Sequence, residues 1–199
     1  NISIKIHNFS LDSGGYYDED RIKEIVRNIP KDEKIILLLT SVHSISGMDM
    51  DVTLILKENK EIRKDIVILT DDNYAAMKVD KIGCEVGAEM SAFSAFKLLG
   101  PVGIGCLVGK KEFVEKVKKL NYSGGGQVQG YEAMEVLRGL VYAPVSLAIQ
   151  AQENEKSVER LNNKKKYPYI KEAFLANAQS KVLLVEFEEN VAEKIIEAA

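Results

Sequence analysis

The chain has 199 residues, of which 46% are hydrophobic and 29% are charged, and its formal net charge is −3. This composition is typical of a folded globular protein and excludes a disordered or fibrous chain. The weak negative charge gives no indication of a nucleic-acid partner, and no apolar run reaches the roughly 20 residues that a membrane span needs. We therefore expect a cytoplasmic protein that binds neither nucleic acid nor a membrane.

Cysteine and histidine are too sparse for metal chemistry. Cys84 and Cys106 stand apart in the sequence, as do His7 and His43. None of them has the spacing that metal ligands show, and a cytoplasmic setting keeps isolated thiols reduced. We expect two free cysteines and no metal site.

The first half of the chain alternates short apolar runs with stretches of helical spacing. The expected order is a strand at 2–6, a helix at 18–29, a strand at 34–40, a helix at 51–64 and a strand at 65–70. A further buried strand is expected at 103–109, after a less regular region that contains 90–94. Most of these apolar runs are continuous rather than alternating, which is typical of strands covered on both faces. The sequence predicts an α/β fold with a mostly parallel sheet and helices on both faces.

The second half is predicted to be mainly helical at first. A helix at 110–120, a glycine-rich turn at 122–130 and a long helical pattern at 131–161 precede the polar, proline-containing segment 162–168. We place a domain boundary there, with a larger domain and its long linking helix over 1–161. Residues 162–199, with a strand at 181–187 and a helix from 190, would begin a smaller α+β C-terminal domain. The first strand lacks an initiator Met and the last helix lacks a cap, which favours a segment of a longer protein.

Two segments carry residues that could take part in ligand binding or catalysis. The segment "DIVILTDDNYAAM" places Asp71 and Asp72 at the end of a predicted strand, where α/β folds bind ligands, although Asp is also a common helix N-cap. The segment "SAFSAFKLLGPVGIG" places Lys97 among apolar and small residues, where a charged amine is rarely found without a partner. Either the Lys97 side chain reaches water from the end of an element, or its amine has a function that needs a dry environment.

Together the two segments resemble fold-type I pyridoxal 5'-phosphate (PLP) enzymes, the superfamily of aminotransferases, cystathionine lyases and cysteine desulfurases. "SAFKLLGPVGIG" is similar to the desulfurase segment in which a Lys precedes Gly-Pro-x-Gly-x-Gly, and "TDDNY" is similar to the strand end that carries an Asp. The stretch 65–162, together with 176–187, is most similar to a little-characterised bacterial group of PLP-dependent transferases.

The resemblance implies a role for each matching residue. Lys97 would be the catalytic residue and would hold PLP as an internal aldimine. Asp71 would pair with the pyridine nitrogen of the cofactor, with Asp72 as the alternative if the register differs. Ser94 would bond the cofactor phosphate.

Three further residues are candidates for cofactor binding by the same resemblance. Tyr74 ends the "TDDNY" motif, and His43 or Ser44, in "SVHSISG", would replace an Asn that bonds the 3-oxygen of the cofactor in many relatives. The glycine-rich segment 122–130 is expected near a subunit interface, with a flexible connection between helices as the alternative.

The function that the resemblance implies is that of a homodimeric PLP enzyme acting on an amino acid, by transamination or by lyase or transferase chemistry. A non-catalytic interaction or scaffold domain derived from such an enzyme is the alternative. The phosphate-binding turn, the aromatic residue that stacks on the cofactor ring and the carboxylate-binding Arg of the family are not recognisable in this sequence. We therefore expect these 199 residues alone to be inactive.

Overall fold

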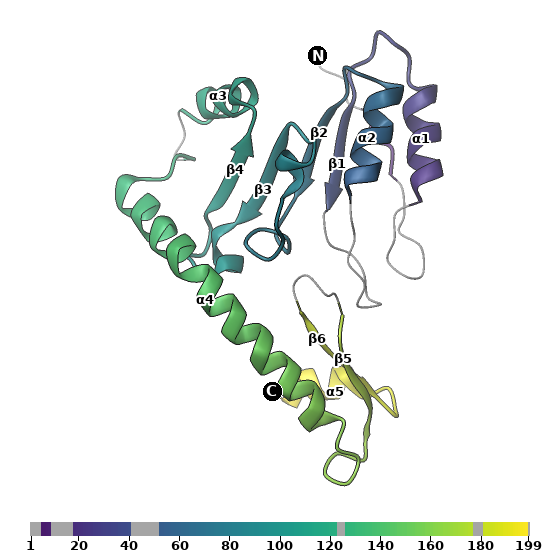
Figure 1. Cartoon of the computed structure of the whole chain (residues 1–199), viewed down its shortest axis with the longest axis vertical. Helices are drawn as coiled ribbons and strands as arrows, with labels where there is room; N and C mark the ends of the chain where they lie inside the picture. Colours follow the sequence, from purple (N-terminus) through teal and green to yellow (C-terminus); the bar gives the residue numbers. More distant parts are fainter. Residues whose placement is uncertain (1–4, 9–17, 41–51, 123–125, 177–180, 199) are drawn as a thin grey trace.

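The computed structural model describes residues 5–8, 18–40, 52–122, 126–176 and 181–198. They form a four-stranded sheet and a two-stranded sheet, and one long helix leads from the first to the second (Figure 1). Of the strand expected at 2–6, residues 5 and 6 adopt no regular structure, and the rest lies outside the described residues.

The strands and helices follow the predicted alternation. The strands are Ile36–Thr40 (β1), Val67–Asp71 (β2), Met90–Ser94 (β3), Gly105–Gly109 (β4), Ile170–Leu175 (β5) and Leu183–Phe187 (β6). The α-helices are Glu19–Asn28 (α1), Thr53–Ile62 (α2), Lys111–Leu120 (α3), Gly130–Leu161 (α4) and Ala192–Ala198 (α5). Two short 3₁₀ helices cover Gly83–Glu85 (η1) and Ala95–Leu98 (η2).

The larger sheet is mostly parallel, which confirms the predicted fold class. Its strand order is β1-β2-β3-β4, and the first three strands run parallel, with Thr40 opposite Asp71 and Asp71 opposite Ala92. The strand β4 is antiparallel to β3 and places Gly105 opposite Ser94. It lies at the edge of the sheet and is partly exposed, whereas its apolar residues predicted a buried strand.

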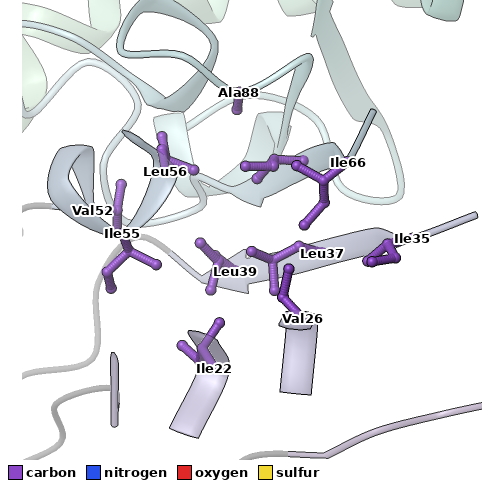
Figure 2. Packing of buried hydrophobic residues seen from close by; sticks show 11 residues of the cluster. Ile22, Val26, Ile35, Leu37, Leu39, Val52, Ile55, Leu56, Ile66 and Ala88 are labelled. Carbon is purple, nitrogen blue, oxygen red and sulfur yellow. The ribbon is translucent and has the colours of Figure 1, made fainter. Parts of the chain in front are cut away.

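The main core lies between one face of this sheet and the helices α1 and α2 (Figure 1, Figure 2). Leu37 and Leu39 of β1 point into this core because alternate residues of a strand face opposite sides. Their neighbours Ile36 and Leu38 are 73% and 59% exposed on the other side. The side chains that pack around β1 include Ile22, Val26, Ile55, Leu56, Ile66 and Ile68.

Helix α4 links the two sheets and packs against the segment that carries Lys97. Ala143 and Leu147 of α4 are buried against Leu98 of η2. At Gly139 an added Cβ atom would lie only 3.0 Å from the Cα atom of Gly100, so the two backbones approach closely at this crossing. In the described part of the chain, no helix combines the length and the apolar character needed to cross a membrane.

Beyond α4 the chain forms the two-stranded antiparallel sheet of β5 and β6, and then α5 (Figure 1). The strand β5 was not predicted from the sequence, whereas β6 and α5 were. Helix α4 ends at Leu161, next to the position proposed for the domain boundary. The division into two domains at this point stays a prediction.

Candidate functional site

The ends of β2 and β3 bring four of the sequence-predicted site residues to one edge of the sheet. Both strands run in the same direction, so their carboxyl ends meet at the same edge. Asp71 is the last residue of β2 and Ser94 is the last residue of β3. Tyr74 lies in the turn after β2, and Lys97 lies in η2 directly after β3.

The amine of Lys97 rests on aromatic side chains. Its Nζ atom donates a hydrogen bond of 2.8 Å to the Tyr74 hydroxyl, and it lies 4.6 Å from the Tyr74 ring centroid and 4.8 Å from that of Phe96. The side chain is half-buried, and among the described residues no carboxylate forms an ion pair with it. The partner that the structure gives this amine is therefore a phenol.

Asn73 ties the ends of the two strands together beside Asp71. An oxygen of the Asp71 carboxylate accepts hydrogen bonds from the backbone N–H of Asn73 at 3.1 Å and from its side-chain amide at 2.7 Å. The side-chain oxygen of Asn73 accepts from the backbone N–H of Ser94 at 2.8 Å. This connection fixes the half-buried carboxylate of Asp71 relative to the start of the Lys97 segment. Sequence reasoning missed Asn73, although Asp and Asn are typical of turns, in which an Asp side chain accepts from the backbone N–H two residues on.

Asp72 points to the opposite side and is fully buried. Its carboxylate accepts hydrogen bonds from the Thr70 hydroxyl at 2.8 Å and from the backbone N–H of Gly83 at 3.2 Å. The Thr70 oxygen also lies 3.0 Å from the Ser91 hydroxyl, which accepts from the backbone N–H of Cys84 at 2.7 Å. We call this set the buried network, and it joins β2, β3 and η1; its members are Thr70, Asp72, Gly83, Cys84 and Ser91. Because the two aspartates face opposite sides, the geometry favours Asp71 over Asp72 as the residue that contacts a ligand.

A second lysine lies at the same aromatic ring and was not found from the sequence. The Nζ atom of Lys78 is 5.4 Å from the Tyr74 ring centroid. Burial, and secondly the positive charge of Lys97, lower the pKa of Lys78 below that of an ordinary lysine. No sequence signal marks Lys78, because its position depends on the path of the turn after β2.

The remaining predicted residues cannot be placed. His43 and Ser44 lie outside the described residues, as do residues 123–125 of the glycine-rich segment. Their proposed roles stay predictions. The cysteines Cys84 and Cys106 are free, and among the described residues no group of His, Cys, Asp and Glu is arranged to hold a metal ion.

A cavity of about 320 Å³ lies next to the Lys97 segment, between residues 98–101 and α4. A second cavity, of about 370 Å³, lies between residues 5–7 and α1. Neither cavity is lined by Lys97, Tyr74 or Asp71. These two cavities therefore lie outside the predicted site.

Two protein-family models match this chain. The model of the Aminotransferase class-V family matches residues 2–137, and the model of the YhfS-like C-terminal domain matches residues 155–199. The chain belongs to the class-V aminotransferase family.

Individual relatives match different shares of the chain. The protein YhfS of Escherichia coli (strain K12) is 53% identical over 131 residues, which are 66% of this chain and 36% of YhfS. The crystal structure of the PLP-dependent protein YhfS from Escherichia coli matches with a TM-score of 0.74 and 41% identity, over 90% of this chain and 48% of that one. A carbon–sulfur lyase from Clostridium novyi shares the fold, with a TM-score of 0.69 at 22% identity, over 94% of this chain and 46% of that one. The chain thus spans about half the length, or less, of these relatives.

Proposed function

We propose that the full-length protein is a PLP-dependent enzyme that acts on an amino acid, and that Lys97 is the residue that binds the cofactor covalently. PLP is the cofactor of the class-V aminotransferase family and of the cysteine desulfurases related to this chain. The observation that carries the proposal is the contact between the Lys97 amine and the Tyr74 hydroxyl at the carboxyl edge of the sheet. An amine that adds to an aldehyde must be held where the ligand binds, and the hydrogen bond to Tyr74 holds the Lys97 amine at the carboxyl edge of the sheet.

The other residues at this edge fit the cofactor. Asp71 offers a carboxylate of fixed orientation, which is the group that keeps a pyridine nitrogen protonated. The hydroxyl of Ser94 forms no hydrogen bond to another described residue, and we assign it to a phosphate oxygen of the cofactor. When bound, PLP supplies an electron-withdrawing ring that stabilises a carbanion of the substrate. The Tyr74 oxygen holds the Lys97 amine in place and can exchange a proton with its Nζ atom.

The relatives support carbon–sulfur bond chemistry as the first reaction to test. A cysteine desulfurase of Wigglesworthia glossinidia brevipalpis is 32% identical over 130 residues, which are 63% of this chain and 29% of that protein. Cysteine and cystathionine are therefore the first substrates to supply, with release of sulfide, ammonia or a keto acid as the readout. Transamination of a common amino acid is the second reaction. We further propose a homodimer, which light scattering of the full-length protein tests.

The decisive experiment locates the cofactor on the full-length protein. We expect added PLP to give an absorbance band in the near ultraviolet or visible range, which borohydride abolishes, and we expect mass spectrometry to find the reduced adduct on Lys97. Lys97→Ala removes the band, whereas Lys81→Ala, which changes an exposed lysine, keeps it. A protein without such a band would be the non-catalytic scaffold, and an adduct on another lysine would reject the role of Lys97.

A further inference from the structure

The turn after β2 presents the amine of Lys78 to the ring that holds Lys97. The Nζ atom of Lys78 lies 5.4 Å from the centroid of the Tyr74 ring, and that of Lys97 lies 4.6 Å from it. Tyr74 accepts the hydrogen bond from Lys97, so the proton of its own hydroxyl remains available for donation. Both amines thus lie within 5.4 Å of the centroid of one phenol ring, and one of them is bonded to its hydroxyl.

Lys78, like Lys97, differs from the well-covered lysines that pair with carboxylates. The Nζ atom of Lys23 lies 3.0 Å from carboxylate oxygens of Asp20 and Glu58, and Lys60 pairs with Glu89. Lys78 is half-buried, yet none of the carboxylates among the described residues pairs with it. A partly buried charge without a counter-charge is unfavourable, and an anionic ligand would offset that cost.

Asp80, two residues after Lys78, is exposed and forms no ion pair with it in the described part of the chain. The carboxylates at the end of β2 are bound to other partners. Asp71 is held by Asn73, and Asp72 accepts from Thr70 and Gly83 on the other side of the sheet. Among the described residues, the charged groups at the Tyr74 ring are therefore the two amines. This arrangement favours an anionic ligand.

The turn holds Lys78 in a defined position. The backbone N–H groups of Ala75 and Ala76 donate to the carbonyl of Asp72, at 3.0 Å and 2.8 Å, and the N–H of Lys78 donates to the carbonyl of Ala75 at 2.9 Å. Met77 adopts a left-handed conformation with φ 61°, which is uncommon for a residue other than glycine and is often associated with functional sites. The buried network anchors the start of this turn through Asp72. Lys78 is consequently oriented by the fold rather than extended freely into solvent.

We propose that Lys78 and Tyr74 form an anion-binding subsite beside Lys97 that receives a carboxylate of the amino-acid substrate. The assignment to substrate rests on the function proposed above. The Lys78 ammonium supplies the counter-charge and the Tyr74 hydroxyl supplies a directional hydrogen bond. The phosphate of PLP is the other anion that could bind there, but the hydroxyl of Ser94 lies at the end of the neighbouring strand and is the group we assign to it.

The test measures the reactivity of Lys78 in the full-length protein without added PLP. The lysines are labelled with a trace of acetic anhydride. Mass spectrometry then gives the acetylation rate of each lysine in the presence of succinate, of inorganic phosphate, or of neither anion. We expect saturating succinate to slow the acetylation of Lys78 about fivefold or more and to leave exposed Lys81 unchanged. Calorimetry then gives the Kd for succinate, which Lys78→Met should raise about tenfold or more and Lys78→Arg should largely preserve. Circular dichroism confirms that both variants are folded.

Each outcome has one meaning. Protection of Lys78 by succinate that Tyr74→Phe weakens supports the subsite. Protection by phosphate but not by succinate overturns the assignment to a substrate carboxylate, and protection by neither overturns the subsite. Because the labelling needs neither cofactor nor turnover, a missing borohydride-sensitive band would reject the proposed function without changing this result.

Discussion

Gly83 lies where the structure has no space for a side chain, so Gly83→Ala tests the buried network directly. A Cβ atom at Gly83 would lie 2.0 Å from the Oγ1 atom of Thr70, 2.5 Å from its Cγ2 atom and 2.6 Å from its Cβ atom. Rotation of the Thr70 side chain moves the first two atoms but not the third, which is fixed to the backbone of β2. The backbone of η1 or β2 must therefore shift.

The expected loss of stability follows from two contributions. Overpacking of a filled core costs about 1–3 kcal/mol. The shift also disturbs the hydrogen bonds from Thr70 and Gly83 to Asp72, at about 1 kcal/mol each. We expect Gly83→Ala to lower the free energy of unfolding by about 3–5 kcal/mol and to weaken the binding of PLP, because Asp72 begins the turn that carries Tyr74.

The assay is urea unfolding of the full-length protein, followed by circular dichroism. Gly126→Ala is the matched control, because a Cβ atom there meets nothing within 4 Å, and we expect a change of less than about 0.5 kcal/mol. Equal stability of the two variants would refute the reasoning, since it would mean that the contact between η1 and β2 is not as close as the structure shows.

Three other predictions test the site and the sheet. Asn73→Ala removes the side-chain hydrogen bonds to Asp71 and Ser94 but keeps the backbone N–H that also bonds Asp71. We expect PLP to bind about tenfold more weakly, measured by absorbance titration, while stability falls by only about 1–2 kcal/mol. Unchanged affinity would reject the positioning role. Lys97→Ala should remove the absorbance band of PLP. Its thermal unfolding midpoint should stay within a few degrees of that of the unsubstituted protein, because one hydrogen bond is lost. Burial raises the pKa of Glu89, but hydrogen bonds from Lys60 and two further donors outweigh it and hold that pKa below 4.5. The stabilisation from this carboxylate is present above the unfolded pKa and is lost as the pH falls through the lower folded pKa. Glu89→Gln should therefore reduce the pH dependence of the free energy of unfolding below about pH 4.5. An unchanged pH dependence would contradict this assignment.

The elements with a strong apolar pattern were predictable, and those that depend on their neighbours were not. The strands β1 and β2 are nearly continuous apolar runs, and α1 has helical spacing with Asp18 as its N-cap. By contrast, β3 reads Met-Ser-Ala-Phe-Ser, and it forms a strand because β2 and β4 pair with it on both sides. The sequence of β5 places charged residues between apolar ones, and its pairing with β6 was not visible in the pattern.

The same distinction applies to the candidate site. Lys97 and Asp71 stand in sequence motifs, so their resemblance to a known family revealed them. Asn73 and Lys78 act through the shape of the turn after β2, which depends on the left-handed Met77 and on the buried Asp72. Neither feature can be read from residue types alone, so these two residues required the structure.

The close contact between Gly100 and Gly139 gives α4 a pivot beside the Lys97 segment. From Gly139 to Leu161 the helix extends about 33 Å, so a tilt of ~10° about the contact would move its far end by roughly 6 Å. Pro144 lies just past the contact and lacks the N–H that would bond to the preceding turn, which makes this the point where α4 bends most easily. A tilt of α4 at this contact would therefore displace the sheet of β5 and β6 more than the Lys97 segment, and a displacement of that sheet would be transmitted to the segment through the helix.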